Sequence, residues 1–309
     1  MRRVFQLLAF CSAAAGFGLT PACDRLPSMD GLSSTLSGTP AEPSKETLLQ
    51  TAINSAHRTE AEKARDAWRR PLETLAFFGV EPQMTVMEVW PGGGWYTNIL
   101  APYLATGDGV LYAAHFDPTL SPAAATAIAD YKARYTADKQ SFGDVRVTAF
   151  NPADAAQASV PANSVDAVLT FRNVHNWLEG AAAETAFKEF FQALKPGGVL
   201  GVVEHRADPS TGDGESHGGY VTEASVIALA QEAGFVLEAA SDINANPADT
   251  KDHPFGVWTL RPVRRSADAP GKRAADFPRA QYDAIGESDR MTLRFRKPSA
   301  ADSSALTAR

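Results

Sequence analysis

Short apolar runs alternate with stretches of helical spacing along most of the chain. This alternation predicts an α/β protein in which helices cover a largely parallel sheet. The predicted strands lie at residues 86–89, 109–116, 145–150, 165–171, 199–203, 235–240 and 290–296. The predicted helices lie at residues 60–78, 96–104, 122–137, 184–194 and 222–233.

The helix predicted at residues 60–78 contains Pro71, which should restart or kink it, and Gly79 should end it. Such a helix would cover the edge of the sheet next to the first strand. Asp66, Arg69 and Arg70 are expected on its solvent-exposed face, and the alternative is that they form a lid over a ligand.

The first predicted strand ends in a turn made of Pro91 and three glycines, Gly92 to Gly94. A strand, a glycine turn and a helix together place unpaired backbone N–H groups and the positive end of a helix dipole at one point. Because glycines lack side chains, a ligand can approach this backbone closely. Glu88 adds a carboxylate, so the turn suits a ligand with an amine and ribose hydroxyls.

These residues resemble motif I of the class I S-adenosylmethionine (SAM) methyltransferases, an acidic residue followed by Gly-x-Gly-x-Gly. The acidic position is Glu88, the last two glycines are Gly92 and Gly94, and Trp90 stands at the first glycine position. Leu-Lys-Pro-Gly-Gly at residues 194–198 also resembles the turn that leads into strand five of this family. The resemblance implies a Rossmann-like seven-stranded sheet, parallel except for an antiparallel strand seven, with helices on both faces.

The resemblance also implies SAM as the cofactor and assigns its contacts. The predicted cofactor-binding residues are Glu88, Trp90, Pro91, Gly92, Gly93, Gly94, Tyr96, Thr97, His115, Asp117, Asn151, Asp154 and Arg172. Within this set, His115 and Asp117 are alternatives for the ribose hydroxyls, and Asn151 and Asp154 for the adenine amine. Trp90, Trp95 and Trp177 could shield the sulfonium by cation–π contact or could be core aromatics.

Polar residues gather after the fourth predicted strand, where the sequence reads Arg-Asn-Val-His-Asn-Trp at residues 172–177. Open α/β sheets place their ligands at the ends of central strands, next to the switch point. His175 has an ordinary pKa near neutrality and could take a proton from a substrate nucleophile. Asn173 and His175 are therefore the predicted catalytic residues.

No metal site is expected. His205, Asp213, Glu215 and His217 carry suitable ligand atoms, but their spacing matches no established metal motif. A loop that faces the substrate is the preferred interpretation of this segment.

Residues 1–23 are expected to be an export signal, because Arg2 and Arg3 precede an apolar stretch that runs to Leu19. The residues before Cys23 resemble a bacterial lipoprotein signal, which predicts an exported, periplasmic protein with a lipid on Cys23. Ordinary cleavage after Ala22 and an uncleaved anchor are the alternatives. The glycine-turn and Arg-Asn-x-His motifs are also similar to a branch of exported bacterial predicted methyltransferases.

The remaining chain divides by composition. Residues 24–45 are predicted to be a flexible linker, 46–298 a methyltransferase-like domain, and 299–309 a disordered tail. An insertion at about 241–289 is expected to cover the ligand cleft, although residues 266–275 could equally be a mobile excursion. Its exposed basic rim would contain Arg264, Arg265, Lys272 and Arg273.

The composition narrows the functional classes. The chain has 309 residues, a formal charge of −7 and two cysteines, Cys11 and Cys23. The negative charge argues against a nucleic-acid-binding protein. The sequence therefore predicts a SAM-dependent methyltransferase with a small-molecule acceptor, which touches the membrane only through its N-terminal signal or lipid.

An alternative function is an exported, non-catalytic ligand-binding or interaction protein on the same fold. Trp90 at a glycine position favours it, as does the cytoplasmic synthesis of SAM. A nicotinamide-linked oxidoreductase is weaker, because the first turn lacks Gly-x-Gly-x-x-Gly.

Overall fold

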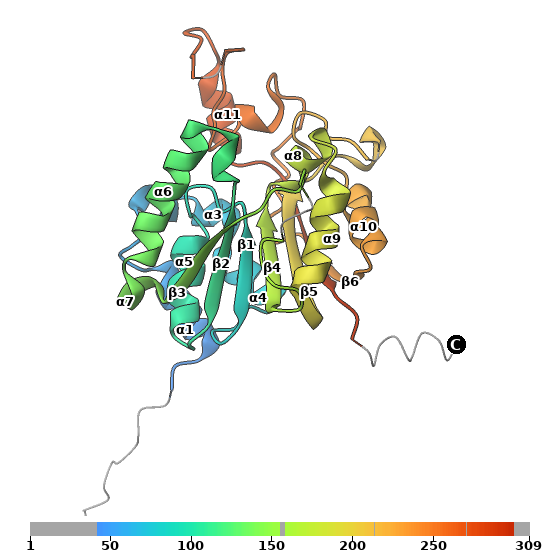
Figure 1. Cartoon of the computed structure of the whole chain (residues 1–309). Helices are drawn as coiled ribbons and strands as arrows, with labels where there is room; N and C mark the ends of the chain where they lie inside the picture. Colours follow the sequence, from blue (N-terminus) through green and yellow to red (C-terminus); the bar gives the residue numbers. More distant parts are fainter. Residues whose placement is uncertain (1–41, 155–157, 213, 270, 300–309) are drawn as a thin grey trace, which may run out of the picture. The chain divides into compact units, whose positions relative to one another are not determined.

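A seven-stranded sheet forms the centre of the structure, with strand order β3-β2-β1-β4-β5-β7-β6 (Figure 1). The computed structural model describes residues 42–154, 158–212, 214–269 and 271–299. The strands are β1 (Thr85–Val89), β2 (Val110–His115), β3 (Asp144–Ala149), β4 (Val165–Phe171), β5 (Leu194–His205), β6 (Val236–Ser241) and β7 (Arg290–Arg296). Strands β1 to β5 pair in parallel, whereas β7 runs antiparallel to both β5 and β6. The predicted fold class is confirmed, including the position of the antiparallel strand.

The helices follow the predicted alternation and add several short elements. They are α1 (Lys45–Ile53), α2 (Glu60–Lys63), α3 (Asp66–Arg69), α4 (Pro71–Phe78), α5 (Thr97–Ala105), α6 (Pro122–Thr136), α7 (Lys139–Phe142), α8 (Val174–Glu179), α9 (Ala183–Ala193), α10 (Glu223–Glu232) and α11 (Arg279–Ile285). Three 3₁₀ turns occur at η1 (Pro118–Leu120), η2 (Pro209–Thr211) and η3 (Gly256–Thr259).

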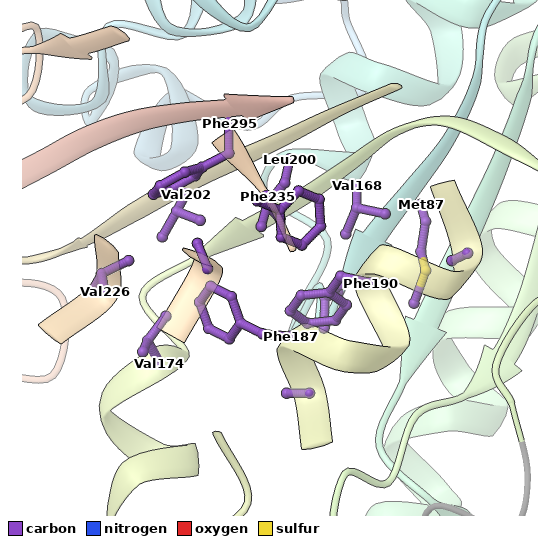
Figure 2. Packing of buried hydrophobic residues seen from close by; sticks show 14 of the residues in the cluster. Met87, Val168, Val174, Phe187, Phe190, Leu200, Val202, Val226, Phe235 and Phe295 are labelled. Atoms are coloured by element: carbon purple, nitrogen blue, oxygen red, sulfur yellow. The ribbon is translucent and has the colours of Figure 1, made fainter. Parts of the chain in front are cut away.

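Two apolar layers hold the helices on the sheet. On one face, Phe187 and Phe190 of α9 are buried against β4, β5 and β7. Figure 2 shows these two rings beside Val168, Leu200 and Val202. On the other face, α1, α4, α5 and α6 pack against strands β1 to β5 through a second buried cluster. Because side chains alternate along a strand, one strand supplies both layers.

The segment before β1 differs from the prediction at two points. Ser44 caps α1 by accepting a hydrogen bond from the Thr47 N–H, so the expected flexible linker ends at the cap of a helix. The helix expected at residues 60–78 is divided into three short helices. The restart at Pro71 was predicted and follows Arg70, which takes a left-handed conformation (φ 38°), whereas the break between α2 and α3 was not predicted. Proline disfavours the helical conformation in the residue that precedes it. Gly79 ends α4, as predicted.

The insertion at residues 241–289 contains η3 and α11 and is fixed by buried polar groups. The Asp249 carboxylate accepts hydrogen bonds from the Tyr220 hydroxyl and the Asp289 N–H. His253 Nε2 lies 2.7 Å from the same carboxylate. Figure 1 shows α11 beyond the carboxyl ends of the parallel strands, at the same end of the sheet as α8.

The predicted signal segment with Cys11 and Cys23, and the tail at residues 300–309, lie outside the described residues. Within the part of the chain that the structure describes, no helix is long and apolar enough to cross a membrane.

The aromatic layer on α9 makes a testable contribution to stability. Phe190 is fully buried and packs on Phe150, Trp177 and Phe187. The substitution Phe190→Ala removes a large buried ring and leaves a cavity, so it should lower the free energy of unfolding by about 3–5 kcal/mol. Urea unfolding followed by circular dichroism measures this loss. Leu120→Ala is the control, because Leu120 is 62% exposed and its truncation should change stability by less than about 0.5 kcal/mol.

Candidate functional site

A cavity of about 350 Å³ lies at the carboxyl ends of β1 and β4. These strands are neighbours at the point where the strand order reverses, where open α/β sheets bind ligands. The residues that line the cavity are Glu62, Arg65, Arg69, Glu88, Val89, Trp90, Pro91, Gly92, Gly93, Trp95, Tyr96, Phe116, Phe171, Arg172, Asn173 and Pro262. Eight of the predicted site residues are in this set: Glu88, Trp90, Pro91, Gly92, Gly93, Tyr96, Arg172 and Asn173.

The glycine turn exposes its backbone to the cavity. A Cβ atom added at Gly92 or Gly93 would have no neighbouring atom within 4 Å, so open space lies beside both residues. Gly92 also has a φ of 59°, a left-handed conformation that glycine adopts without strain. Gly94 has a different role, because a Cβ atom there would lie 2.1 Å from the Tyr135 hydroxyl oxygen. The first two glycines thus open the turn to a ligand, and the third lets α6 pack closely.

Trp90 has a φ of 47°, which explains why this position suits glycine in the family that the motif resembles. Its indole N–H donates a hydrogen bond to the Phe150 carbonyl at 3.0 Å. The ring packs against Phe116 and Trp177, with centroid distances of 4.8 and 5.5 Å. The indole therefore forms one wall of the cavity and leaves the space beside the glycine turn open.

Glu88 is 1% exposed and borders the cavity beneath the glycine turn. The Thr97 hydroxyl, on the first turn of α5, donates to Glu88 Oε2 at 2.6 Å. Because the single Thr97 hydroxyl proton is used in this bond, Thr97 Oγ1 accepts a hydrogen bond from the Tyr131 hydroxyl at 2.6 Å. Burial raises the pKa of Glu88 to about 7, and the Thr97 hydrogen bond offsets only part of that rise.

His115 is buried at the end of β2 and supports the glycine turn. Its Nδ1 accepts from the Phe116 N–H at 2.8 Å, so the proton is on Nε2, which donates to the Gly92 carbonyl at 3.2 Å. Burial lowers the pKa of His115, which favours this neutral form. His115 does not line the cavity, but it fixes the backbone that does.

Asp117, Asn151 and Asp154 lie outside the cavity lining. The Asp117 carboxylate accepts from the backbone and hydroxyl of Thr119, whose hydrogen bonds lower the pKa of Asp117. The Asn151 side chain accepts from the Ala153 N–H and so closes a local turn. The structure thus does not bring these three residues together with the glycine turn.

Aromatic rings form the floor of the cavity. Tyr96 stacks on Phe171 with a centroid distance of 3.6 Å and an interplanar angle of 11°. Phe116 follows His115 and faces Trp90. Sequence reasoning named Tyr96 but missed Phe116 and Phe171, because apolar residues at strand ends look the same whether they face a core or a cavity.

The two predicted catalytic residues occupy different environments. Asn173 lines the cavity, and its amide nitrogen donates to the Val89 carbonyl and Thr170 Oγ1. Its Oδ1 is the atom left to face a ligand. His175 is 4% exposed, does not line the cavity, and holds its Nδ1 at 3.0 Å from Glu204 Oε1. Burial alone would lower the pKa of His175, but the Glu204 carboxylate raises it above its ordinary value.

Among the described residues, one group of potential metal ligands, His175, Glu204 and His205, comes within 4.8 Å. Glu204 already accepts hydrogen bonds from the N–H groups of Val174, His175 and His205. His205 Nδ1 lies 2.5 Å from Ser288 Oγ. These contacts explain why the three side chains lie close together: they form a hydrogen-bonded structural cluster. Of the ligands considered from sequence, His217 is exposed beside Glu215, and Asp213 lies outside the described residues.

Arg65 and Arg69 also line the cavity, and the sequence did not reveal this. The expectation that Arg69 lies on a solvent-exposed face is wrong, because its side chain is 3% exposed and paired with Glu287. The sequence contained one signal for this pair, the spacing of the two arginines, because residues four apart lie on one face of a helix. Their partner, Glu287, is 222 residues beyond Arg65 and 218 beyond Arg69, so the sequence alone does not reveal the pairing.

The central part of the chain is similar to known methyltransferases. Residues 88–202 match the family model described as "Methyltransferase domain". The matched segment starts at Glu88 and includes the glycine turn and the end of β4. A domain of this kind points to S-adenosylmethionine as the cofactor, in agreement with the sequence prediction.

The chain is also similar to solved structures at low sequence identity. A candidate sarcosine dimethylglycine methyltransferase from Galdieria sulphuraria is 14% identical, with 77% of this chain and 88% of that chain covered and a TM-score of 0.50. A SAM-dependent methyltransferase from Aquifex aeolicus is 19% identical, with coverages of 59% and 87% and a TM-score of 0.45. Geranyl diphosphate C-methyltransferase from Streptomyces coelicolor A3(2) is 15% identical, with coverages of 80% and 87% and a TM-score of 0.49.

The first of these similarities supports the Rossmann-like methyltransferase fold. Among curated proteins, none matches the chain.

The burial of Glu88 should make the stability of the folded protein depend on pH. Its pKa rises from an ordinary 4.5 to about 7 on folding, so the folded state holds the extra proton between these values. Stability is therefore lost as the pH rises through this window, by about 3 kcal/mol in total. Glu88→Gln should stabilise the ligand-free protein at pH 8 and have little effect at pH 4.5. Urea unfolding at both pH values measures this difference, and equal effects at both would contradict the assigned environment.

Proposed function

We propose that this protein is a SAM-dependent methyltransferase that acts on a small molecule. The observation that carries the proposal is the cavity beside Gly92 and Gly93, where a bare backbone and the Glu88 carboxylate meet at the switch point of a methyltransferase fold. The match of residues 88–202 to a methyltransferase domain supports it.

The residues around the cavity fit the chemical groups of SAM. Gly92 and Gly93 leave room for a ligand against the backbone, as a bulky cofactor requires. Glu88, when ionised, can pair with the amine of the methionyl group. The rings of Trp90, Tyr96 and Phe116 offer aromatic surface to an adenine or a sulfonium.

SAM supplies an electrophilic methyl group whose bond to sulfur breaks as the acceptor's electron pair attacks. The protein mainly has to align the acceptor with that methyl group and exclude water. Asn173 is the better placed of the two predicted catalytic residues, because it lines the cavity and His175 does not. In this proposal, Asn173 Oδ1 orients the acceptor, and the His175–Glu204 pair holds the end of β4 in place.

The pKa of Glu88 makes SAM binding dependent on pH. Only the ionised carboxylate pairs with the cationic ligand, and a pKa of about 7 means that most of it is protonated at pH 6. The dissociation constant for SAM should therefore rise about tenfold from pH 8 to pH 6. Isothermal titration calorimetry measures this change. In Glu88→Gln, the affinity at pH 8 should fall about tenfold, on the order of 1.4 kcal/mol, and the pH dependence should flatten.

Glu184→Gln is the matched control, because Glu184 is an exposed carboxylate on α9 paired with Lys188. It should bind SAM like the parent protein at both pH values. Absence of heat with both SAM and its demethylated product would refute the methyltransferase proposal and favour a binding protein for another ligand.

We further propose that the protein is exported and anchored by a lipid on Cys23. The support is the basic start at Arg2 and Arg3, the apolar stretch that follows, and the small residues before Cys23. The full chain should fractionate with membranes, and Cys23→Ala should move it to the soluble periplasmic fraction. Immunoblots of the fractions distinguish these outcomes, and an unchanged distribution would exclude the lipid.

A further inference from the structure

Four arginines surround a single carboxylate at one side of the cavity. Arg65 Nε and Arg69 Nε lie 2.7 and 2.9 Å from oxygens of Glu287, and Arg290 Nη1 lies at 3.1 Å. Arg172 also acts electrostatically on Glu287. Burial would raise the pKa of Glu287, but these arginines hold it at about 2, so it stays ionised. Four positive charges therefore face one negative charge.

Part of this guanidinium surface has no partner in the described chain. The Nη2 atoms of Arg65 and Arg69 are buried and make no hydrogen bond. No ion pair or side-chain hydrogen bond joins Arg172 to any described residue, and the residue is half-buried at the end of β4. Leaving the buried Nη2 donors of Arg65 and Arg69 unpaired is costly, because these groups carry charge. Such donors are ready to bind a ligand oxygen.

The unpaired groups border the proposed site. Arg65, Arg69 and Arg172 line the same cavity as Gly92 and Gly93. Trp95 holds Arg69 by a cation–π contact, with the guanidinium carbon 4.6 Å from the ring centroid. Burial first, and the Arg172 charge next, lower the pKa of Arg69 to about 9, which still leaves it charged at neutral pH. A planar, fixed guanidinium matches the paired oxygens of a carboxylate or a phosphate.

SAM does not balance this charge. Its sulfonium and amine are positive and its carboxylate is negative, so it brings a net charge of about +1 to a lining that holds three arginines and two carboxylates, Glu62 and Glu88. We propose that the cavity binds an acceptor with a carboxylate or phosphate group, and that Arg65, Arg69 and Arg172 hold this oxyanion. This inference rests on the proposed methyltransferase function, and it assigns Arg172, which the sequence predicted as a cofactor contact, to the acceptor instead. Phe171, which also lines the cavity, would contact the apolar part of the same acceptor.

The test uses the full chain and two probe anions, benzoate and inorganic phosphate. S-adenosylhomocysteine is titrated first, which tests the proposed function alone. Each anion is then titrated into the saturated complex by calorimetry. At least one anion should bind with a stoichiometry of one. In Arg172→Gln, its affinity should fall at least tenfold while the affinity for S-adenosylhomocysteine stays within twofold.

Arg65→Gln is a second variant, because the Arg65 side chain is 25% exposed and tolerates substitution more readily than Arg69. It should weaken the same anion. Arg146→Gln is the matched control, since Arg146 is a half-exposed arginine on β3 paired with Asp144, and it should bind both ligands like the parent protein.

Two results would overturn the inference. If Arg172→Gln and Arg65→Gln weaken S-adenosylhomocysteine but leave the anion unaffected, the arginines hold the methionyl carboxylate of the cofactor. If neither anion binds the complex, the cavity does not select an oxyanion. Failure of S-adenosylhomocysteine to bind would instead refute the proposed function, and titration of the anions into the free protein would still test the arginines.

Discussion

The ion-pair cluster at Glu287 joins parts of the chain that are far apart in sequence. Its carboxylate binds Arg65 and Arg69 from the segment before β1 and Arg290 at the start of β7. A buried carboxylate without these partners would be strongly destabilising, so the N-terminal helices and the end of the insertion have to meet at this point. The same contacts bring the two N-terminal arginines to the cavity at the end of β1. Stability and the charge of the site thus depend on one carboxylate.

The glycine turn depends on a second set of supports. His115 holds the Gly92 carbonyl, and Thr97 holds the Glu88 carboxylate from the first turn of α5. Trp90 adopts a left-handed conformation that costs a non-glycine residue on the order of 1 kcal/mol. Its hydrogen bond to Phe150 and its contacts with Phe116 and Trp177 offset this cost. The departure from the glycine pattern is therefore accommodated by packing, and the cavity remains open beside it.

Local patterns predicted most of the architecture. Strand β4 and strand β7 have the predicted boundaries, because each is an apolar run bounded by turn residues. The glycine turn was recognisable for the same reason, since its neighbours in space are its neighbours in sequence. Between residues 60 and 78 the restart at Pro71 was predicted, but the break between α2 and α3 was not, because it leaves little trace in a hydrophobic pattern. Within the insertion, η3 and α11 were missed for lack of any clear periodicity.

The sequence by itself determined the order of strands and helices, the glycine turn and the carboxylate beside it, because periodicity and turn chemistry act over a few residues. The tertiary structure decided which polar side chains meet. In the folded chain, His115 supports the glycine turn and Arg69 is in a buried ion pair. His175 is not among the residues that line the cavity. The physical reason is that burial and charge pairing are set by neighbours in space, and Glu287 lies 218 residues from the Arg69 that it binds.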